Sequence, residues 1–151
     1  MTFYYRIKGG LPLETFIYLT VAAVGLLFGS FTNVMIARIP AGESIVAPPS
    51  HCPQCGHRLG AMDLVPVLSW LFLRRKCRYC RGSISSRYPL VEILTAALFA
   101  GVYWRWGMSA ETLAGWILVI ILVSTAFSIP GGRFSWPPIR HGDGSFALDK
   151  A

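Results

Sequence analysis

The chain has 151 residues, of which 54% are hydrophobic and only 14% are charged, and its formal net charge is +7. A soluble domain of this length would carry more charge and less apolar surface, so the composition predicts an all-α polytopic membrane protein. The positive charge lies mostly in one loop between apolar segments, where membrane topology accounts for it. The lipid bilayer is therefore an expected partner, and nucleic acid is not.

The chain opens with a predicted leader, residues 1–12, followed by a predicted transmembrane helix over residues 13–37. This apolar run can cross a hydrocarbon core about 30 Å thick, and it lacks the small-residue cleavage site of a signal peptide. Gly25 and Gly29 are four residues apart, a spacing that favours close helix packing, although glycine is also common in membrane helices generally. Asn33 needs a hydrogen-bond partner and should face protein.

The next predicted segment is a loop over residues 38–87, which contains eight Lys or Arg residues but only two acidic residues, Glu43 and Asp63. Basic residues concentrate in cytoplasmic loops, so this loop is expected on the cytoplasmic side. Disulfides are rare there.

All four cysteines lie in this loop, as the pairs Cys52-Pro-Gln-Cys55 and Cys77-Arg-Tyr-Cys80. Two such pairs have the spacing of a tetrahedral Zn²⁺ site; two disulfides or a redox dithiol are the alternatives, and a cytoplasmic loop disfavours disulfides. Because four thiolates leave no position for a substrate water, the zinc is expected to be structural. Gly56 and Gly82 are predicted to provide the positive φ of the tight turns.

An apolar run, residues 63–73, separates the cysteine pairs and is too short to span a bilayer. It suits an interfacial helix, with Trp70 at headgroup depth and Arg74, Arg75 and Lys76 reaching for phosphate. It also suits an ordinary core segment of the zinc loop, and the sequence leaves both interpretations open.

Two further transmembrane helices are predicted, over residues 88–106 and 109–129, and then an extended tail over residues 130–151. Glu92 falls near the start of its helix, where water and the helix dipole make its charge tolerable, and Arg38 or Arg87 could pair with it. Ser109 is a candidate N-cap. Three crossings would place the N-terminus outside and the zinc loop and C-terminus in the cytoplasm.

Several motifs occur in an order that resembles the N-terminal region of type IV prepilin peptidases. They are residues 29–34, 38–40, 42–46, 49–57, 66–71, 77–80 and 84–92. The resemblance implies a bacterial inner-membrane enzyme that cleaves the leader of prepilins of the type IV pilus and then N-methylates the new terminus. Pilin-like proteins would be its substrates.

The proteolytic aspartate pair of that family has no counterpart here. There is no Asp between Asp63 and Asp143, and residues 126–131 stand where the first aspartate would be. Gly142-Asp143-Gly144 resembles the second aspartate motif only weakly, and the later helices of the family are missing. The chain is therefore expected not to cleave prepilins by itself, and the sequence leaves open whether it is an enzyme.

Two functions remain open. The chain could be the zinc-binding half of a prepilin peptidase that works with a separate aspartate-bearing half. In that case Glu43 is a candidate methyl-transfer residue by resemblance, with S-adenosylmethionine as the donor, although Glu43 could equally be a loop residue paired with an arginine. Alternatively, the chain is a non-catalytic accessory subunit of a larger membrane complex, which the missing aspartates favour.

Overall fold

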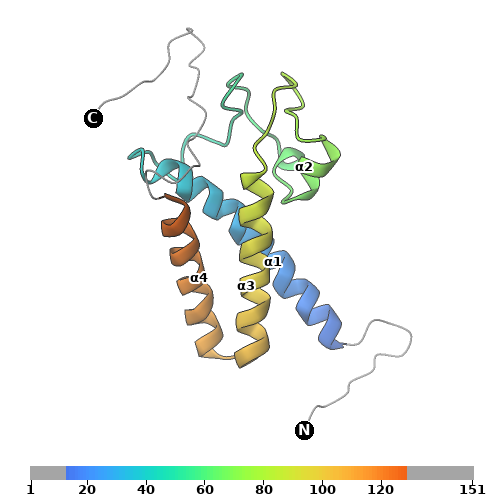
Figure 1. The fold of residues 1–151 in the computed structure, drawn as a ribbon, viewed down its shortest axis with the longest axis vertical. Coiled ribbons are helices and arrows are strands. Elements are labelled where there is room, and N and C mark those ends of the chain that lie inside the picture. The colour runs from blue at the N-terminus through green and yellow to red at the C-terminus, as the bar shows by residue number, and fades with distance from the viewer. Residues whose placement is uncertain (1–12, 129–151) are drawn as a thin grey trace.

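The computed structural model describes residues 13–128, so the predicted leader and the predicted tail lie outside the described part (Figure 1). That part is mostly helical, as expected. Its elements are α1 (Leu13–Arg38), the short 3-10 turn η1 (Ala61–Asp63), α2 (Leu68–Phe72), α3 (Arg87–Trp106) and α4 (Ala110–Ser128).

The three long helices pack against one another, and the cysteine loop lies at one end of them. Figure 1 shows α3 and α4 as a hairpin, with α1 crossing α3 obliquely, and all three pairs of long helices are in contact. The loop between α1 and α3 lies at the same end of the long helices as the last turn of α4. At that end, Arg87 Nη2 donates to the carbonyl oxygen of Phe127 over 2.8 Å and ties α3 to α4.

Glycines allow α1 and α3 to cross closely. A Cβ at Gly25 would lie 2.6 Å from the Cα of Ala96, and one at Gly29 would lie 2.7 Å from the Cα of Glu92. Both distances are shorter than atoms tolerate, so the crossing requires glycine, and the predicted packing face is confirmed. One turn later, Asn33 Nδ2 donates to the carbonyl oxygen of Tyr88 over 3.1 Å, which provides the expected partner in protein.

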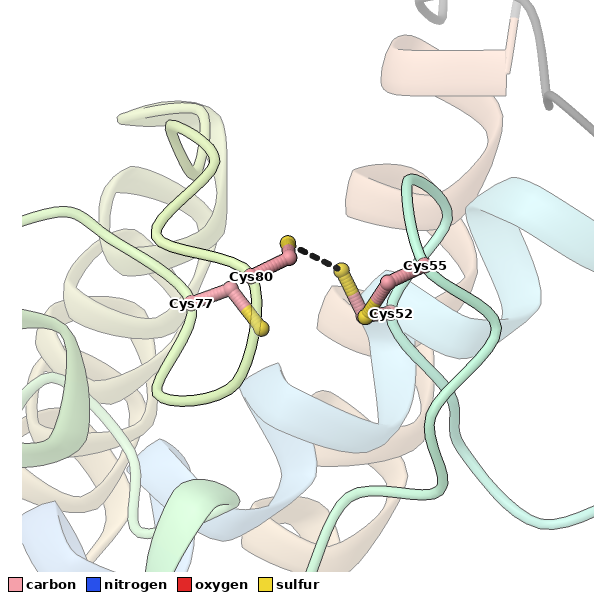
Figure 2. A group of neighbouring side chains, drawn as sticks. All are labelled: Cys52, Cys55, Cys77 and Cys80. Carbon is pink, nitrogen blue, oxygen red and sulfur yellow. Dashed lines mark hydrogen bonds between the residues drawn. The ribbon is translucent and has the colours of Figure 1, made fainter.

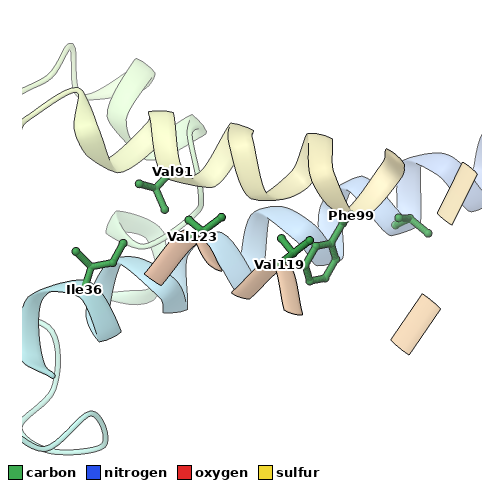
Figure 3. Packing of buried hydrophobic residues seen from close by; sticks show 6 residues of the cluster. Ile36, Val91, Phe99, Val119 and Val123 are labelled. Atoms are coloured by element: carbon green, nitrogen blue, oxygen red, sulfur yellow. The ribbon is translucent and has the colours of Figure 1, made fainter. Parts of the chain in front are cut away.

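A small apolar core fills the space between the helices (Figure 3). Val21, Ile36, Val91, Phe99, Val119 and Val123 form its buried cluster. The ring of Phe99 stacks on that of Trp116 with centroids 5.0 Å apart, and the Trp116 indole N–H donates to the carbonyl oxygen of Phe99 over 3.1 Å. These contacts join α3 to α4, because Phe99 and Trp116 lie on facing helices.

Two of the long helices, α1 and α4, are long and apolar enough to be candidate membrane spans. The predicted third span, α3, forms a helix of 20 residues but does not pass the same test. Charged Arg87, Glu92 and Arg105 within α3 lower its hydropathy. The α3–α4 connection confirms the predicted N-cap, since the Ser109 hydroxyl accepts a hydrogen bond from the Thr112 backbone N–H over 3.3 Å.

Candidate metal centre

The first cysteine pair lies on a tight backbone turn. The Cys52 N–H donates to the His57 carbonyl over 2.9 Å, and the Gly56 N–H donates to the Cys52 carbonyl over 2.8 Å. An isolated β-bridge between His51 and Arg58 closes the base of this turn. Gly56 has φ +68°, as predicted, because the turn there needs a left-handed residue.

The second pair repeats this arrangement with one difference from the sequence prediction. The Cys77 N–H donates to the Gly82 carbonyl over 2.8 Å, the Arg81 N–H donates to the Cys77 carbonyl over 3.0 Å, and Lys76 bridges Ser83. The left-handed residue of this turn is Arg81, with φ +61°, so the assignment of positive φ to Gly82 was wrong. The position that matches Gly56 is the residue directly after the second cysteine, not the next glycine.

The two turns bring the four thiols together. All four Sγ atoms lie within 4.8 Å of one another, and Figure 2 shows one pair facing the other across a short gap. The Sγ atoms of Cys52 and Cys80 are 4.0 Å apart, and all four cysteines are free thiols. Four sulfurs each about 2.3 Å from a tetrahedral Zn²⁺ would be roughly 3.8 Å apart. The cluster can therefore hold a metal ion such as zinc.

Side chains next to the cysteines hold the two turns against each other. The rings of His57 and Tyr79 lie 3.6 Å apart between centroids, inclined by 30°. Gln54 reaches from the first turn to the second, where its Nε2 donates to the Ser83 carbonyl over 3.4 Å. These contacts join the two turns beside the thiols.

Asp63 fastens the second turn to η1. Its carboxylate accepts hydrogen bonds from Arg78 Nε over 2.7 Å, from the Tyr79 hydroxyl over 3.3 Å and from the Gly60 backbone N–H over 3.1 Å. Burial tends to raise the pKa of this carboxyl, but the Gly60 N–H and the Arg78 guanidinium outweigh it and lower the pKa. Asp63 is therefore a structural carboxylate of the metal loop.

The thiols lie too close together to be four free thiolates. Burial raises the pKa of Cys52 to about 12, with neighbouring thiols adding to the effect. Burial would also raise the pKa of Cys77, but hydrogen bonds from the Cys80 and Tyr79 backbone N–H groups bring it down to about 7. A metal ion bound by the four sulfurs would neutralise the negative charge that four neighbouring thiolates bring together.

A metal ion held by all four thiolates would have a closed tetrahedral shell. Such a site stabilises the loop and leaves no coordination position for a water or a substrate. Of the four ligands, Cys52 and Cys77 are buried and Cys55 and Cys80 are exposed, so each turn contributes one inner and one outer sulfur.

Glu43, the candidate for methyl transfer, lies on the loop just after α1. It follows Gly42, which has φ +68°, and its backbone N–H donates to the carbonyl of Arg38 over 2.9 Å. Its side chain is exposed, and within residues 13–128 no ion pair involves it. Arg38 instead donates to the carbonyls of Ser44 and Pro48 over 2.8 and 2.7 Å, which folds the loop after α1. The methyl-transfer role of Glu43 stays a prediction.

Glu92 differs from its sequence prediction, because it is buried rather than near water. Its Oε2 accepts a hydrogen bond from the Val67 backbone N–H over 2.7 Å, whereas Arg38 and Arg87 donate to backbone carbonyls. Trp70 is half-buried, and its indole N–H donates to the Ile84 carbonyl over 3.3 Å, while its position at headgroup depth stays a prediction. Glu92 therefore ties the start of α2 to α3, and Trp70 ties α2 to the end of the loop.

Asp63, Tyr79 and Glu92 are the supporting residues whose roles the sequence did not reveal. The sequence around a single acidic residue such as Asp63 does not show which donors its carboxylate will bind. An acid inside an apolar helix does carry one, because burying a carboxylate requires a hydrogen-bond donor, but the donor Val67 is 25 residues away.

The sequence of this chain is similar to members of one protein family. Residues 23–106 match the family model described as the bacterial peptidase A24 N-terminal domain. Prepilin leader peptidase/N-methyltransferases from Myxococcus xanthus and Neisseria gonorrhoeae are 51% and 38% identical over 69% and 76% of this chain. These matches cover 31% and 49% of the two relatives, so the chain spans less than half of their length. No solved structure matches.

Proposed function

Because this chain belongs to the family of bacterial peptidase A24 N-terminal domains, we propose that it is the zinc-binding membrane module of a prepilin-processing system. The observation that carries the proposal is the set of four thiols within 4.8 Å of one another inside the region that matches the family. In this proposal the zinc is structural, and it fixes the loop that the module presents at the end of its helices.

In the proposed topology α1, α3 and α4 all cross the bacterial inner membrane. The contacts of α3 with both candidate spans support its inclusion, although its own hydropathy is lower. Its buried Glu92 is hydrogen-bonded, which is how membrane helices tolerate a carboxyl group. Eight basic residues in the metal loop favour a cytoplasmic loop, with the start of α1 outside.

We further propose that the module does not cleave prepilins by itself. Aspartic peptidases need two carboxylates that share a proton, one to activate water and one to protonate the leaving amine. Asp63 is the only aspartate among residues 13–128, and it is fully engaged by Gly60, Arg78 and Tyr79. Proteolysis would therefore need aspartates from outside the described residues, and a separate aspartate-bearing polypeptide is the proposed partner.

Methyl transfer is the activity this module could retain, with S-adenosylmethionine as donor. Glu43 supports it as an exposed carboxylate on the same loop as the metal centre. The relatives' names join leader peptidase and N-methyltransferase, so pilin-like proteins are the proposed substrates. Glu43→Gln should abolish methylation in a reconstituted system and leave leader cleavage intact.

The second candidate function is that of an accessory subunit in a larger membrane complex, which is favoured because the one aspartate among residues 13–128 is structurally engaged. Mass spectrometry of what co-purifies with the tagged chain from mild-detergent extracts of native membranes distinguishes the two. A stoichiometric partner that carries an aspartate pair supports the processing function. A stoichiometric complex without such a subunit supports the accessory function.

The metal part of the proposal has its own test. The purified chain should contain one zinc per molecule, and Cys52→Ser with Cys55→Ser should remove the zinc and lower the melting temperature. Absence of zinc from the parent chain, or an unchanged melting temperature in the double variant, would contradict a structural metal. Leader cleavage by the purified chain alone would contradict the proposed lack of proteolysis.

A further inference from the structure

A short segment beside the metal centre exposes apolar side chains next to a row of cations. The segment, residues 61–76, comprises η1, α2 and the turn after α2; we call it the anchor segment. Its exposed apolar side chains are Met62, Leu64, Leu68, Leu71 and Phe72, and Phe72 is 82% exposed. Arg74, Arg75 and Lys76 follow directly and are also exposed.

The backbone of the anchor segment is strained where these cations lie. Arg74 and Arg75 have φ of +50° and +63°, in the region that glycine adopts most easily. The Arg75 N–H donates to the Trp70 carbonyl over 2.9 Å, so this turn closes α2 in the way a glycine usually does. The turn thereby places two consecutive arginines directly after the apolar side chains of α2.

Hydrogen bonds place α2 at a defined depth along α3. The Val67 N–H, at the start of α2, donates to Glu92, the sixth residue of α3. At about 1.5 Å per residue, that contact lies roughly 7 Å inside the start of α3. If α3 crosses the membrane as proposed above, α2 lies at the boundary between headgroups and acyl chains, where amphipathic helices bind. Figure 1 shows α2 beside the first turns of α3.

We propose that the anchor segment binds the cytoplasmic leaflet, with Phe72 and its apolar neighbours among the acyl chains and Arg74, Arg75 and Lys76 on anionic phospholipid headgroups. The complementary charge favours a lipid occupant, because an anionic headgroup layer pairs with three adjacent cations while apolar tails cover the side chains beside them. The segment would thereby hold the metal centre against the membrane surface. This inference rests on the proposed membrane topology.

Photo-crosslinking of the full chain in lipid nanodiscs tests the inference. Phe72 is replaced by p-benzoylphenylalanine, the bilayer contains phosphatidylcholine with a minor fraction of phosphatidylglycerol, and mass spectrometry identifies the adducts. Val46, which is 86% exposed on the loop after α1, is the matched control position, and Leu27, 61% exposed on α1, is the lipid-facing control. We expect lipid adducts at 72 and 27 but not at 46.

The headgroup preference tests the cations separately. Adducts at position 72 should be enriched in phosphatidylglycerol by several-fold over its bulk fraction, since one cation near an anionic surface contributes a factor of roughly five. Arg74→Gln, Arg75→Gln and Lys76→Gln together should return the adducts to the bulk composition. Arg58→Gln with Arg81→Gln, which removes cations of the cysteine turns, should leave the enrichment unchanged.

Each remaining outcome overturns the inference in a distinguishable way. Suppose that position 27 gives lipid adducts but position 72 gives only protein adducts or none. This result would reject the anchor and leave the proposed membrane topology intact. Adducts at 72 with the bulk composition in the parent chain would reject headgroup recognition. No lipid adduct at 27 would reject the membrane topology and the anchor with it.

Discussion

Several positions of this loop with positive φ hold residues other than glycine. Arg81 has φ +61° at the place where the first cysteine turn uses Gly56. A side chain at such a position is strained by roughly 1 kcal/mol, and the strain is tolerated because the turn itself is set by the Cys77–Gly82 and Arg81–Cys77 hydrogen bonds. The two turns therefore share a geometry but not the residue that usually produces it.

Arg81→Gly is expected to stabilise the metal loop by about 0.5–1 kcal/mol, because glycine adopts the observed φ without strain. Thermal unfolding of the zinc-loaded chain measures the effect. Arg81→Gln serves as the control, since it removes the charge and keeps the strained side chain, and it should not stabilise the loop. If the glutamine variant stabilised the chain as much as the glycine variant, the effect would come from the lost charge and not from relieved backbone strain.

We expect the chain to lose its metal ion as the pH is lowered. Each ligand must lose its proton to bind the metal, so protons compete with zinc and a falling pH favours release. Burial raises the pKa of Cys52 to about 12, so this thiol resists deprotonation without a metal. A chromophoric chelator should extract zinc much faster at about pH 5 than at about pH 8. Equal rates at the two pH values would argue against thiolate ligation.

At the scale of elements, the contact between α1 and α3 depends on backbone proximity. Gly29→Ala would place a Cβ 2.7 Å from the Cα of Glu92, where no side-chain movement can relieve the clash. The helices must move apart, which we expect to cost about 1–3 kcal/mol in a denaturant titration in detergent. Gly101 lies in α3 with nothing within 4 Å of its would-be Cβ, so Gly101→Ala should be neutral.

The position of α2 depends on one buried carboxylate. Glu92→Ala leaves the Val67 N–H without its acceptor, which costs about 1–3 kcal/mol and should loosen residues 65–73. Hydrogen exchange read by mass spectrometry should show faster exchange in that segment. Glu92→Gln keeps an acceptor and should restore most of the protection, and Glu111→Ala, on exposed α4 surface, should have no effect there. Unchanged exchange in Glu92→Ala would mean that other contacts hold α2.

At the scale of the whole molecule, the hydrogen bond from Arg87 to Phe127 places the end of α4 beside the metal loop, and the α3–α4 connection lies at the opposite end. Alkaline phosphatase, which needs disulfides and so is active only outside the cytoplasm, reports this arrangement. A fusion after Met108 should be active, and one after Gly60 inactive. The reverse pattern would invert the proposed orientation.

The family and the clustering of the four cysteines could be predicted from local sequence. The resemblance to prepilin peptidases is confirmed by the family model, and the clustering of Cys52, Cys55, Cys77 and Cys80 was implied by their spacing. Helix positions follow from apolar runs ended by charge, proline or glycine, because these signals act within a few residues. Packing at Gly25 and Gly29 was also predicted, since only small residues permit such a crossing.

The tertiary structure decided which groups meet across long stretches of chain. Glu92 was expected near water but accepts a hydrogen bond from Val67, Trp70 donates to the Ile84 carbonyl, and Asp63 accepts hydrogen bonds from Arg78 and Tyr79. A buried polar group must find a partner, but which partner depends on how α2 folds back against α3. Local sequence therefore determined the helices and the cysteine cluster, whereas the folded chain decided the hydrogen bonds that place them.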